Sequence, residues 1–572
     1  MKTTREGHDP IFRYCSGWKA YLLLLLLALS FFAPGTASLP PTDRDEARYI
    51  QASRQMMETG DYTRIFFQDA PRHKKPIGVY WLQVASVKVF GDGDLQSLFA
   101  YRIPSIFAAV LSVLAVFFFG QFFSNSRVAF LGAGILSTVT MLVVEARLAK
   151  ADAVLLASIV ITQFLLGLLY IRKFDPTSVV FKVVPYLFWF SLAVGTLIKG
   201  PVAPAVFVLT LGALLVFDRD RRWIADLRPV SGVLLACAVI APWLIAIEST
   251  TEQSFIVQSW TEDILPKLIS GHESHWGPPG YYLLSSLLTF WPWSLLLVPA
   301  VVWLWRGRKT REGFFLLCWL MPAWLALEVM PTKLPHYTLP LFPVLALGVS
   351  GALSDSTLLQ EVFWRWPARV SWYLWTAVTG VVVLGLFTIP VYFGSSISVW
   401  QLASIVASAL GLYYVQTKST EIGGNRIGLG LFLIAFALPL FLAGTFPALS
   451  NFWLSEKIAN NEVVKNRAQD ARLIVVGYRE PSLVFLTETN TLLASPGDAA
   501  QTFGDSARAV AVVREDEREP FLKGLQSIQL NCPIVSSVSG FNYSKGKWRE
   551  LSVFARDRCE KQAQNNTESE IN

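Results

Sequence analysis

Long apolar runs alternate with short polar segments along residues 1–446. A run of about 20 mostly apolar residues is long enough to cross a bilayer as a helix. The pattern therefore predicts about thirteen transmembrane helices, with the break between the fifth and sixth placed at Lys199-Gly200-Pro201. The runs lie at 18–37, 98–123, 128–145, 153–172, 183–198, 201–217, 229–247, 280–305, 313–330, 337–352, 370–392, 398–416 and 427–446.

Three longer polar stretches separate or follow these runs. Two are the loops 38–97 and 248–279, and the third is the tail 447–572. In the tail, "RLIVVGY", "ARAVAVVRE" and "ELSVFAR" are apolar enough for strands, whereas "EPSLVFL" and "EPFLKGL" fit helices. The predicted fold class is a polytopic α-helical membrane protein (1–446) with a C-terminal α/β domain (447–572). The polar end "KQAQNNTESEIN" is expected to be disordered.

Composition agrees with a membrane protein. Hydrophobic residues make up 53% of the 572 and charged residues only 16%, where a soluble chain carries about a quarter. The 20 tryptophans suit membrane interfaces. The formal charge of +7 requires no nucleic-acid partner, because cationic loops beside membrane spans account for it.

Lysine and arginine predict the orientation. One set of alternate short loops holds about twenty of them, and the other set holds about four, so the first set should face the cytoplasm. The N-terminus is then cytoplasmic, and the two long loops and the tail lie in the periplasm. The first run ends in "APGTAS", which is similar to a signal-peptide cleavage site. We expect residues 1–38 to be retained, and cleavage is the alternative.

The first outer loop opens with an unusually charged helix pattern. Residues 42–59 fit a helix with Thr42 as N-cap and Gly60 as stop. Asp45, Arg48 and Tyr49 then share one face. The functional interpretation makes Asp45 a general base for an acceptor hydroxyl. In the alternative interpretation this acid only favours the helix dipole.

A cluster of cations follows in the same loop, between two prolines. Its members are Arg72, His73, Lys74 and Lys75. The next segment, "PIGVYWLQ", has an apolar and aromatic face suited to a membrane surface. Cations at this level suit a phosphate carried by a lipid. General attraction to anionic lipids is the alternative, but it gives no role to a neighbouring acid.

These residues carry a resemblance. "DRDEARYIQASRQMMETGDY", "HKKPIGVYWLQ", "ARLAKADAVL", "LIKGPVAP", "HWGPPGYYL" and "KLPHYTLPLFP" follow in order between about residues 40 and 350. The chain resembles the bacterial lipid A aminoarabinose transferases, in the protein O-mannosyltransferase superfamily of GT-C glycosyltransferases. The resemblance implies inverting sugar transfer from a polyprenyl-phosphate sugar at the periplasmic face of the inner membrane. The implied acceptor is lipid A or lipopolysaccharide core, and a protein acceptor is the alternative within the superfamily.

The resemblance also implies roles for individual residues. Asp45 matches an acid near the acceptor, Asp152 a second acid at the cavity, and Lys75 the lysine that holds the lipid phosphate. Arg48 and Lys333 are expected to help Lys75 neutralise that phosphate. The other residues matching the cavity wall are Tyr49, Lys199, His275 and Tyr337.

One position departs from the family pattern. Aminoarabinose transferases usually carry Glu before the motif lysine, and this chain has Lys74. The departure argues against a metal site that combines this position with His275, and against aminoarabinose as the donor sugar. No cofactor is required by the sequence, and a divalent metal stays open. The tail motifs "GYREPSLVFLTE" and "GFNYSKGK" resemble α-proteobacterial relatives, some of which transfer galacturonic acid to lipopolysaccharide.

Two other classes compete with an enzyme. A transporter of lipid-linked substrates predicts ionisable residues in mid-span or paired broken helices. In this chain the acids and bases gather at outer helix ends instead. A lipid-binding scaffold explains the cations but not Asp45.

Cysteine usage predicts one disulfide. Cys532 and Cys559 both fall in the tail, which should lie in an oxidising compartment. We expect them to form a bridge, and two free thiols are the alternative, since sequence spacing does not give the distance between the two Cβ atoms.

Overall fold

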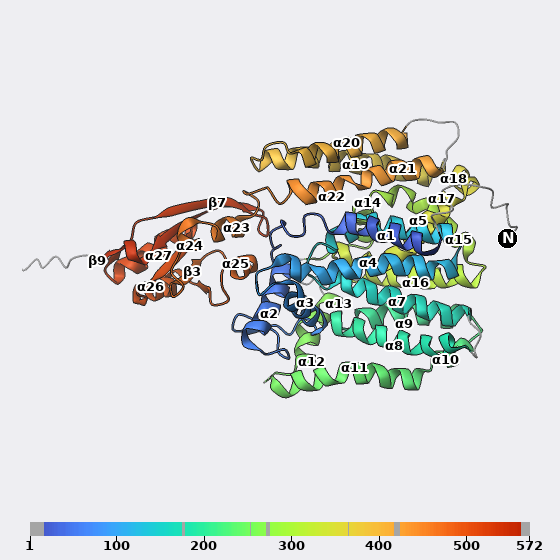
Figure 1. The fold of residues 1–572 in the computed structure, drawn as a ribbon, viewed down its shortest axis with the longest axis horizontal. Coiled ribbons are helices and arrows are strands. Elements are labelled where there is room, and N and C mark those ends of the chain that lie inside the picture. The colour runs from blue at the N-terminus through green and yellow to red at the C-terminus, as the bar shows by residue number, and fades with distance from the viewer. Residues whose placement is uncertain are drawn as a thin grey trace, which may run out of the picture.

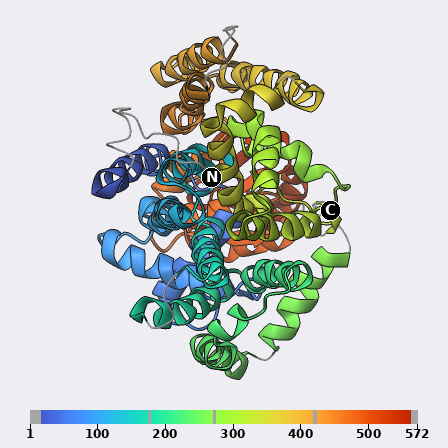
Figure 2. The same ribbon diagram turned by 90° about the vertical axis from the view of Figure 1, so that its right-hand side faces the viewer.

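The computed structural model describes residues 16–173, 178–251, 253–269, 275–363, 365–416 and 424–561. The chain forms a bundle of long helices with a smaller, sheet-containing domain at one end (Figure 1). Figure 2 looks along the bundle, with the red C-terminal domain behind it. The residues 1–15 and 562–572, which include most of the polar end expected to be disordered, lie outside the described ranges.

Eight of the described helical segments are long and apolar enough to cross a membrane. They are Leu98–Phe123 (α4), Asp152–Ile171 (α7), Val179–Lys199 (α8), Trp223–Thr250 (α10 and α11), Arg311–Val329 (α16), Pro335–Ser354 (ending in α17), Trp366–Tyr392 (α19) and Gly424–Thr445 (starting with α21). Shorter apolar helices add to the bundle: Gly17–Phe32 (α1), Val202–Phe217 (α9) and the segment Trp293–Gly307, which ends in α15 (Leu297–Gly307). The membrane class of the fold is confirmed, and the count of thirteen spans stays a prediction.

Some of these segments consist of more than one element: α10 (Trp223–Asp226) and α11 (Pro229–Thr250) form one of them, α17 (Phe342–Ser354) ends another, and α21 (Gly424–Ala435) and α22 (Ala437–Leu440) belong to a third. The other helices of the bundle are α5 (Ser126–Thr138), α6 (Thr140–Glu145), α14 (Tyr281–Thr289), α18 (Ser356–Phe363) and α20 (Val399–Gln416). Figures 1 and 2 both place α11 and the α19–α21 group on opposite sides of the bundle. The expected break after α8 falls at Gly200, whose positive φ of 61° suits a residue without a side chain.

Two apolar runs that the sequence predicted as continuous helices are broken. The run 128–145 divides at Val139 into α5 and α6, and the run 280–305 is interrupted near Pro292. The two breaks meet, because the backbone N–H and the hydroxyl of Thr140 both donate to the carbonyl of Trp291. Backbone groups released by a broken helix need such partners within the protein at membrane depth.

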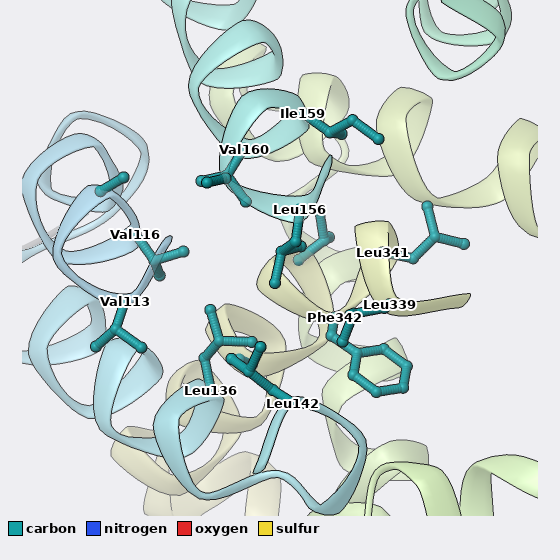
Figure 3. Packing of buried hydrophobic residues seen from close by; sticks show 14 of the residues in the cluster. Val113, Val116, Leu136, Leu142, Leu156, Ile159, Val160, Leu339, Leu341 and Phe342 are labelled. Carbon is teal, nitrogen blue, oxygen red and sulfur yellow. The ribbon is translucent and has the colours of Figure 1, made fainter. Parts of the chain in front are cut away.

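The core of the bundle surrounds α7. Side chains from α4, α5, α6, α7 and the segment 335–342 pack together there, as Figure 3 shows for Leu142, Leu156 and Phe342. In α7, 89% of the apolar window is buried, compared with 22% in α19. The first residue of α7, Asp152, is therefore held at the centre of one end of the bundle rather than at its rim.

Three groups of elements cover that end. The first loop contains α2 (Asp45–Thr59), the strands β1 (Phe66–Phe67) and β2 (Ala70–Pro71), and α3 (Gly78–Phe90). The second loop contributes α12 (Phe255–Gln258), the π-helical turn Ser259–Ile264 and α13 (Leu265–Ile269). A short segment, 146–151, connects α6 to α7.

Helix α2 starts later than the sequence predicted. Thr42 is not its N-cap, because the helix begins at Asp45 and Arg44 has the left-handed φ of 68°. The carboxylate of Glu46 accepts hydrogen bonds from the backbone and hydroxyl of Thr42, so the acid and not the threonine closes this turn. Gly60 ends the helix with φ of 73°, as predicted.

The C-terminal domain is built on a five-stranded mixed sheet of order β4-β3-β5-β8-β7. Strands β3 (Arg472–Val476), β4 (Leu492–Ala494) and β5 (Ala509–Arg514) are parallel, and β8 (Lys547–Ala555) runs antiparallel to β5 and to β7 (Ser536–Asn542). The three segments predicted as strands each form one. The helices are α23 (Leu454–Ala459), α24 (Glu462–Lys465), α25 (Pro481–Leu486), α26 (Pro496–Asp505) and α27 (Arg518–Ser527).

Beyond the main sheet, β6 (Leu530–Asn531) pairs with β9 (Glu560–Lys561). The sulfurs of Cys532 and Cys559 are joined in a disulfide beside this pair, as the sequence suggested. The disulfide thus ties the end of the domain to the strand that follows α27.

The domain is docked on the first loop of the bundle. The backbone N–H of Ser482, at the start of α25, donates to the Asp43 carboxylate over 3.3 Å. Gln51 on α2 donates to the Thr489 hydroxyl over 2.7 Å, and the Arg54 guanidinium donates to the Phe485 carbonyl over 2.9 Å. Several polar contacts from different elements thus fix the domain against α2.

Candidate functional site

A cavity of about 390 Å³ opens at this end of the bundle, between α7, α8, α9 and the π-helical turn. Its inner wall is apolar and includes Leu155, Val206, Leu209, Ala323 and Leu327. Its polar end gathers charged and polar side chains from five segments of the chain. They are Lys74, Lys75, Asp152, Lys199, Asp263, Lys267, His336 and Tyr337. An apolar recess with a charged mouth suits a lipid that carries an anionic headgroup.

Lys75 occupies the mouth of this cavity. Its ammonium lies 2.6 Å from one carboxylate oxygen of Asp263, and the ammonium of Lys267 lies 2.5 Å from the other. Burial disfavours the charged form of Lys75, and although Asp263 opposes this effect, the pKa of the ammonium is lowered to about 8. Burial also disfavours the charged form of Asp263, but here the two lysines outweigh burial. Lys75 and Lys267 hold the pKa of the Asp263 carboxyl below its ordinary value.

Asp152 lies deeper and holds the second lysine. Its carboxylate is 2.5 Å from the ammonium of Lys199, 3.8 Å from Lys150 and 3.6 Å from the Nε2 atom of His336. As the first residue of α7 it also faces the positive end of the helix dipole. The carboxylate is therefore kept ionised and fully engaged, and it fixes the position of Lys199.

Lys150 connects this cluster to a buried acid. Its ammonium lies 2.9 Å from the carboxylate of Glu145. Burial by itself would lower the pKa of Lys150, but Glu145 and Asp152 raise it above its ordinary value. The lysine thus stays charged and supplies positive potential toward Asp45.

Asp45 differs from Asp152 and Asp263 because its carboxylate has no hydrogen-bond or ion-pair partner among the described residues. Its side chain is exposed at the start of α2, and within the described ranges no hydrogen bond or ion pair involves its carboxylate. Desolvation by surrounding protein disfavours its charge, but Lys150 and Arg72 together hold its pKa below the ordinary value. An ionised carboxylate with free lone pairs is what a general base for a hydroxyl requires.

Tyr49 packs against Arg72, one of the cations that lower the pKa of Asp45. The Tyr49 ring is buried and lies 5.3 Å from the Tyr80 ring, centroid to centroid. The guanidinium of Arg72 lies over the Tyr49 ring at 5.0 Å. Tyr49 was predicted to line the substrate cavity, and in the structure it packs beneath the cation that faces Asp45.

Five of the predicted site residues line a cavity. Lys75, Asp152, Lys199 and Tyr337 line the first cavity, and Lys199 also lies 5.7 Å from the Tyr337 ring. Arg48 instead lines a second cavity, against the C-terminal domain.

Lys333 and His275 pair with each other through the backbone. The N–H of Lys333 donates to the carbonyl of His275 over 2.8 Å, next to a bridge between Trp276 and Thr332. The buried ammonium of Lys333 donates to the carbonyls of Leu327 and Glu328, each over 2.6 Å. Lys333 therefore stabilises the end of α16, and the role in phosphate binding predicted for it is not what this geometry favours.

A metal site finds no support in the described part of the chain, where no three His, Cys, Asp or Glu side chains lie together as a metal site requires. His275 is half-buried and has no acid beside it there.

Sequence reasoning missed Asp263, Lys267 and His336. His336 stands inside the quoted motif "KLPHYTLPLFP", between two residues that were singled out. Asp263 and Lys267 have the i,i+4 spacing of a helical ion pair, but nothing in the sequence shows that this pair folds back over Lys75.

Known proteins resemble this chain in part of its sequence and in its fold. A family model described as dolichyl-phosphate-mannose-protein mannosyltransferase matches residues 74–245, which include Lys75, Asp152 and Lys199. The sequence is also similar to curated proteins named undecaprenyl phosphate-alpha-4-amino-4-deoxy-L-arabinose arabinosyl transferase. One from Photorhabdus laumondii is 28% identical over 331 residues, which is 57% of this chain and 58% of the relative. One from Aeromonas hydrophila is 30% identical over 341 residues, 59% of this chain and 60% of the relative.

The chain thus matches about three fifths of the length of these relatives in sequence, whereas the likeness in fold covers nearly the whole chain. The crystal structure of ArnT from Cupriavidus metallidurans bound to undecaprenyl phosphate superimposes with a TM-score of 0.71 at 18% identity, over 94% of this chain and 98% of that one. The oligosaccharyltransferase of Archaeoglobus fulgidus gives a TM-score of 0.51 at 11% identity, over 86% and 66%. The resemblance to the aminoarabinose transferases is confirmed, and the fold is of the GT-C type.

Proposed function

We propose that this protein is an integral membrane glycosyltransferase that transfers a sugar from a polyprenyl-phosphate donor to a hydroxyl of a membrane-associated acceptor. The observation that carries the proposal is the combination, at one end of the bundle, of an apolar recess, a cluster of lysines at its mouth and an unengaged ionised carboxylate nearby. Relatives whose names specify undecaprenyl-phosphate and dolichyl-phosphate sugars support the donor class.

The donor phosphate is placed between Lys75, Lys199 and Lys267. The polyprenyl chain lies along the apolar wall, and the phosphate takes over the contacts that Asp263 now makes with Lys75 and Lys267. Preorganised ammonium groups stabilise the negative charge that develops as the phosphate leaves. Asp152 acts as a positioning residue, because it holds Lys199 at the cavity.

The reaction proceeds at the anomeric carbon. Asp45 takes the proton of the acceptor hydroxyl as its oxygen forms a bond to the anomeric carbon. On the opposite face the bond from that carbon to the phosphate oxygen breaks, and polyprenyl phosphate leaves as an anion bound by the lysines. The configuration of the sugar is inverted in this single displacement. No step uses a cofactor, and treatment with EDTA is expected to leave the rate unchanged.

The acceptor we propose is lipid A or the lipopolysaccharide core, with a protein hydroxyl as the second candidate. The relatives support this choice only as a class, through their arabinosyl transferase names. The excess of cations in the opposite set of loops supports a cytoplasmic N-terminus, with the site and the C-terminal domain on the periplasmic side of the inner membrane.

Two measurements test the function. Membranes with the protein are expected to transfer labelled sugar from a polyprenyl-phosphate donor to an added acceptor, and membranes without it are not. Mass spectrometry of lipid A and core oligosaccharide from cells with and without the protein identifies the sugar and the acceptor. Movement of the intact lipid-linked sugar across the membrane, with no transfer, would replace the proposal with a transporter.

A further inference from the structure

A second cavity, of about 740 Å³, lies between the C-terminal domain and the start of α2. Six of its lining side chains are basic and two, Glu480 and Glu517, are acidic. The basic ones are Arg44, Arg48, Arg479, Arg514, Lys545 and Arg549. Such an excess of cations around one concave space favours an anionic ligand.

The fold of the domain explains why the cavity is at this place. Its wall includes Gly477, Ala494 and Arg514, which lie at the ends of the parallel strands β3, β4 and β5. In open α/β sheets, ligands bind in the crevice beyond the carboxyl ends of the strands. The hairpin between β7 and β8 closes the other side with Lys545 and Arg549. The position of the cavity is thus that of a ligand site.

Internal acids neutralise only some of the cations. Arg514 bonds to Asp516 and Glu517, and Arg549 lies 3.2 Å from Glu515. In the part of the chain that the structure describes, the side chains of Arg479 and Lys545 make no hydrogen bond or ion pair, and both are exposed. Two cations are therefore available to a ligand, beside others already held in position.

The cavity adjoins the proposed catalytic base through one turn of helix. Arg44 immediately precedes Asp45, and Arg48 follows it by three residues, a rise of about 4.5 Å along α2. Arg44 is held by a hydrogen bond of 2.9 Å from its guanidinium to the carbonyl of Ser544 in the hairpin. A ligand in the second cavity is thus next to the residue that would activate its hydroxyl.

We propose that this cavity binds the anionic part of the acceptor, a saccharide that carries phosphate or carboxylate groups. Guanidinium groups match both anions through paired N–H donors. This inference rests on the proposed function, which supplies the role of acceptor. It adds that the C-terminal domain is part of the substrate site, and that a neutral saccharide or an uncharged protein segment is a poor acceptor. Anionic phospholipid is the other source of the same chemistry.

Binding of a saccharide is the first test. The full-length protein in detergent is titrated, without donor, with a phosphorylated disaccharide lacking acyl chains and with the neutral disaccharide. We expect the phosphorylated compound to bind and Arg479→Gln combined with Lys545→Gln to weaken its binding about tenfold or more. The matched control is Arg472→Gln combined with Lys547→Gln, which removes two exposed cations that do not line the cavity and should change affinity less than twofold.

Four outcomes decide between the sources. Selective, variant-sensitive binding of the phosphorylated saccharide supports the proposal. Equal binding of the neutral disaccharide, or equal loss in the control, overturns it. If the protein in nanodiscs binds only vesicles containing phosphatidylglycerol, and the double variant weakens this binding, the proposal is also overturned. The cavity is then assigned to bilayer lipid.

Kinetics separate this inference from the proposed function. If the protein transfers sugar, the double variant should raise KM for the acceptor about tenfold while the kcat and the KM for the donor stay near those of the unmodified protein. If the double variant transfers sugar with unchanged kinetics, the proposed acceptor site is wrong and the proposed function still stands. Binding of the phosphorylated saccharide with no transfer by the unmodified protein contradicts the proposed function alone.

Discussion

Asp45 and Glu46 are adjacent acids with opposite environments. Glu46 is fully buried, receives two hydrogen bonds from Arg102 and a third from the backbone of Ala149, and so ties α2 to the bundle. Asp45 is exposed and has no such partner among the described residues. The sequence pattern singled out Asp45 as the candidate base because it shares a helix face with Arg48 and Tyr49. It did not show that its neighbour is structural, because that depends on an arginine in another helix.

Asp45→Asn is expected to abolish sugar transfer. The amide cannot accept the hydroxyl proton, and general-base catalysis typically contributes about 10²–10⁴-fold to a rate. The measurement is the initial rate of transfer with purified protein, together with its thermal unfolding. Asp92→Asn is the matched control, because Asp92 is an exposed acid of the same loop with a positive φ of 50°, which Asn tolerates. A rate near normal in Asp45→Asn would leave this acid with a role in the helix dipole only.

Lys75 gives the reaction a dependence on pH. Donor binding needs its charged form, and the pKa of about 8 means that this form is lost as the pH rises through 8. The kcat/KM for the donor should therefore fall above about pH 8, because this ratio reports the free enzyme. Lys75→Arg keeps its charge at every pH and should remove the decline up to pH 9, at a lower absolute rate.

Lys75→Ala should reduce kcat/KM for the donor about tenfold to a few hundredfold, through the loss of a charge-assisted contact. Lys88→Ala is the control, since Lys88 is an exposed lysine of α3 that bonds to Tyr62. An equal loss in the two variants would indicate diffuse electrostatic attraction and not a phosphate site.

At the scale of elements, the loop 248–279 forms an ion pair with a lysine of the loop 38–97. The segment from α12 to α13 places Asp263 between Lys75 and Lys267, where the donor phosphate is expected. In the proposed mechanism this acid competes with the donor phosphate for the same two ammonium groups. The sequence shows an i,i+4 ion pair here, but the contact with Lys75 is between residues 188 positions apart.

Asp263→Asn should strengthen donor binding. The amide removes the negative charge that the phosphate must displace. Because Asp263 also helps to keep Lys75 charged, the comparison is made well below pH 8. There KM for the donor is expected to fall several-fold, as about 1 kcal/mol corresponds to fivefold. The measurement is a titration of polyprenyl phosphate against the purified protein. Glu262→Gln, one residue earlier and exposed, should have no effect. Weaker binding in Asp263→Asn would mean that this acid orders Lys75 instead of competing with its ligand.

At the scale of the whole molecule, the proposed function involves two structural units. The bundle contains the proposed donor site, and the C-terminal domain packs on α2 through contacts such as that between Arg54 and the Phe485 carbonyl. The docking brings the carboxyl ends of three parallel strands to the same cavity as Arg44 and Arg48 at the start of α2. The domain is therefore placed where it can present an acceptor to the bundle, and its stability matters for activity.

The disulfide between Cys532 and Cys559 is expected to stabilise this domain by about 2–4 kcal/mol, because it closes a loop of the unfolded chain. Replacing both cysteines with serine should lower the unfolding temperature of the domain in the full-length protein. Alkylation checks the bond directly: neither cysteine should label in the unfolded protein until a reductant is added. Full labelling without reductant would show that both thiols are free.

Local patterns in the sequence were enough to predict the membrane class, the positions of most helices and the strands of the tail. These features are local, because apolar run length, i,i+4 spacing and strand-like runs are read within short windows of the chain. Only the tertiary structure decided which charged residues meet. Glu46 with Arg102, Lys75 with Asp263, and the basic cavity behind Arg44 and Arg48 each join segments far apart in the chain. Such pairings depend on how helices and domains pack, and the residue types alone do not specify them.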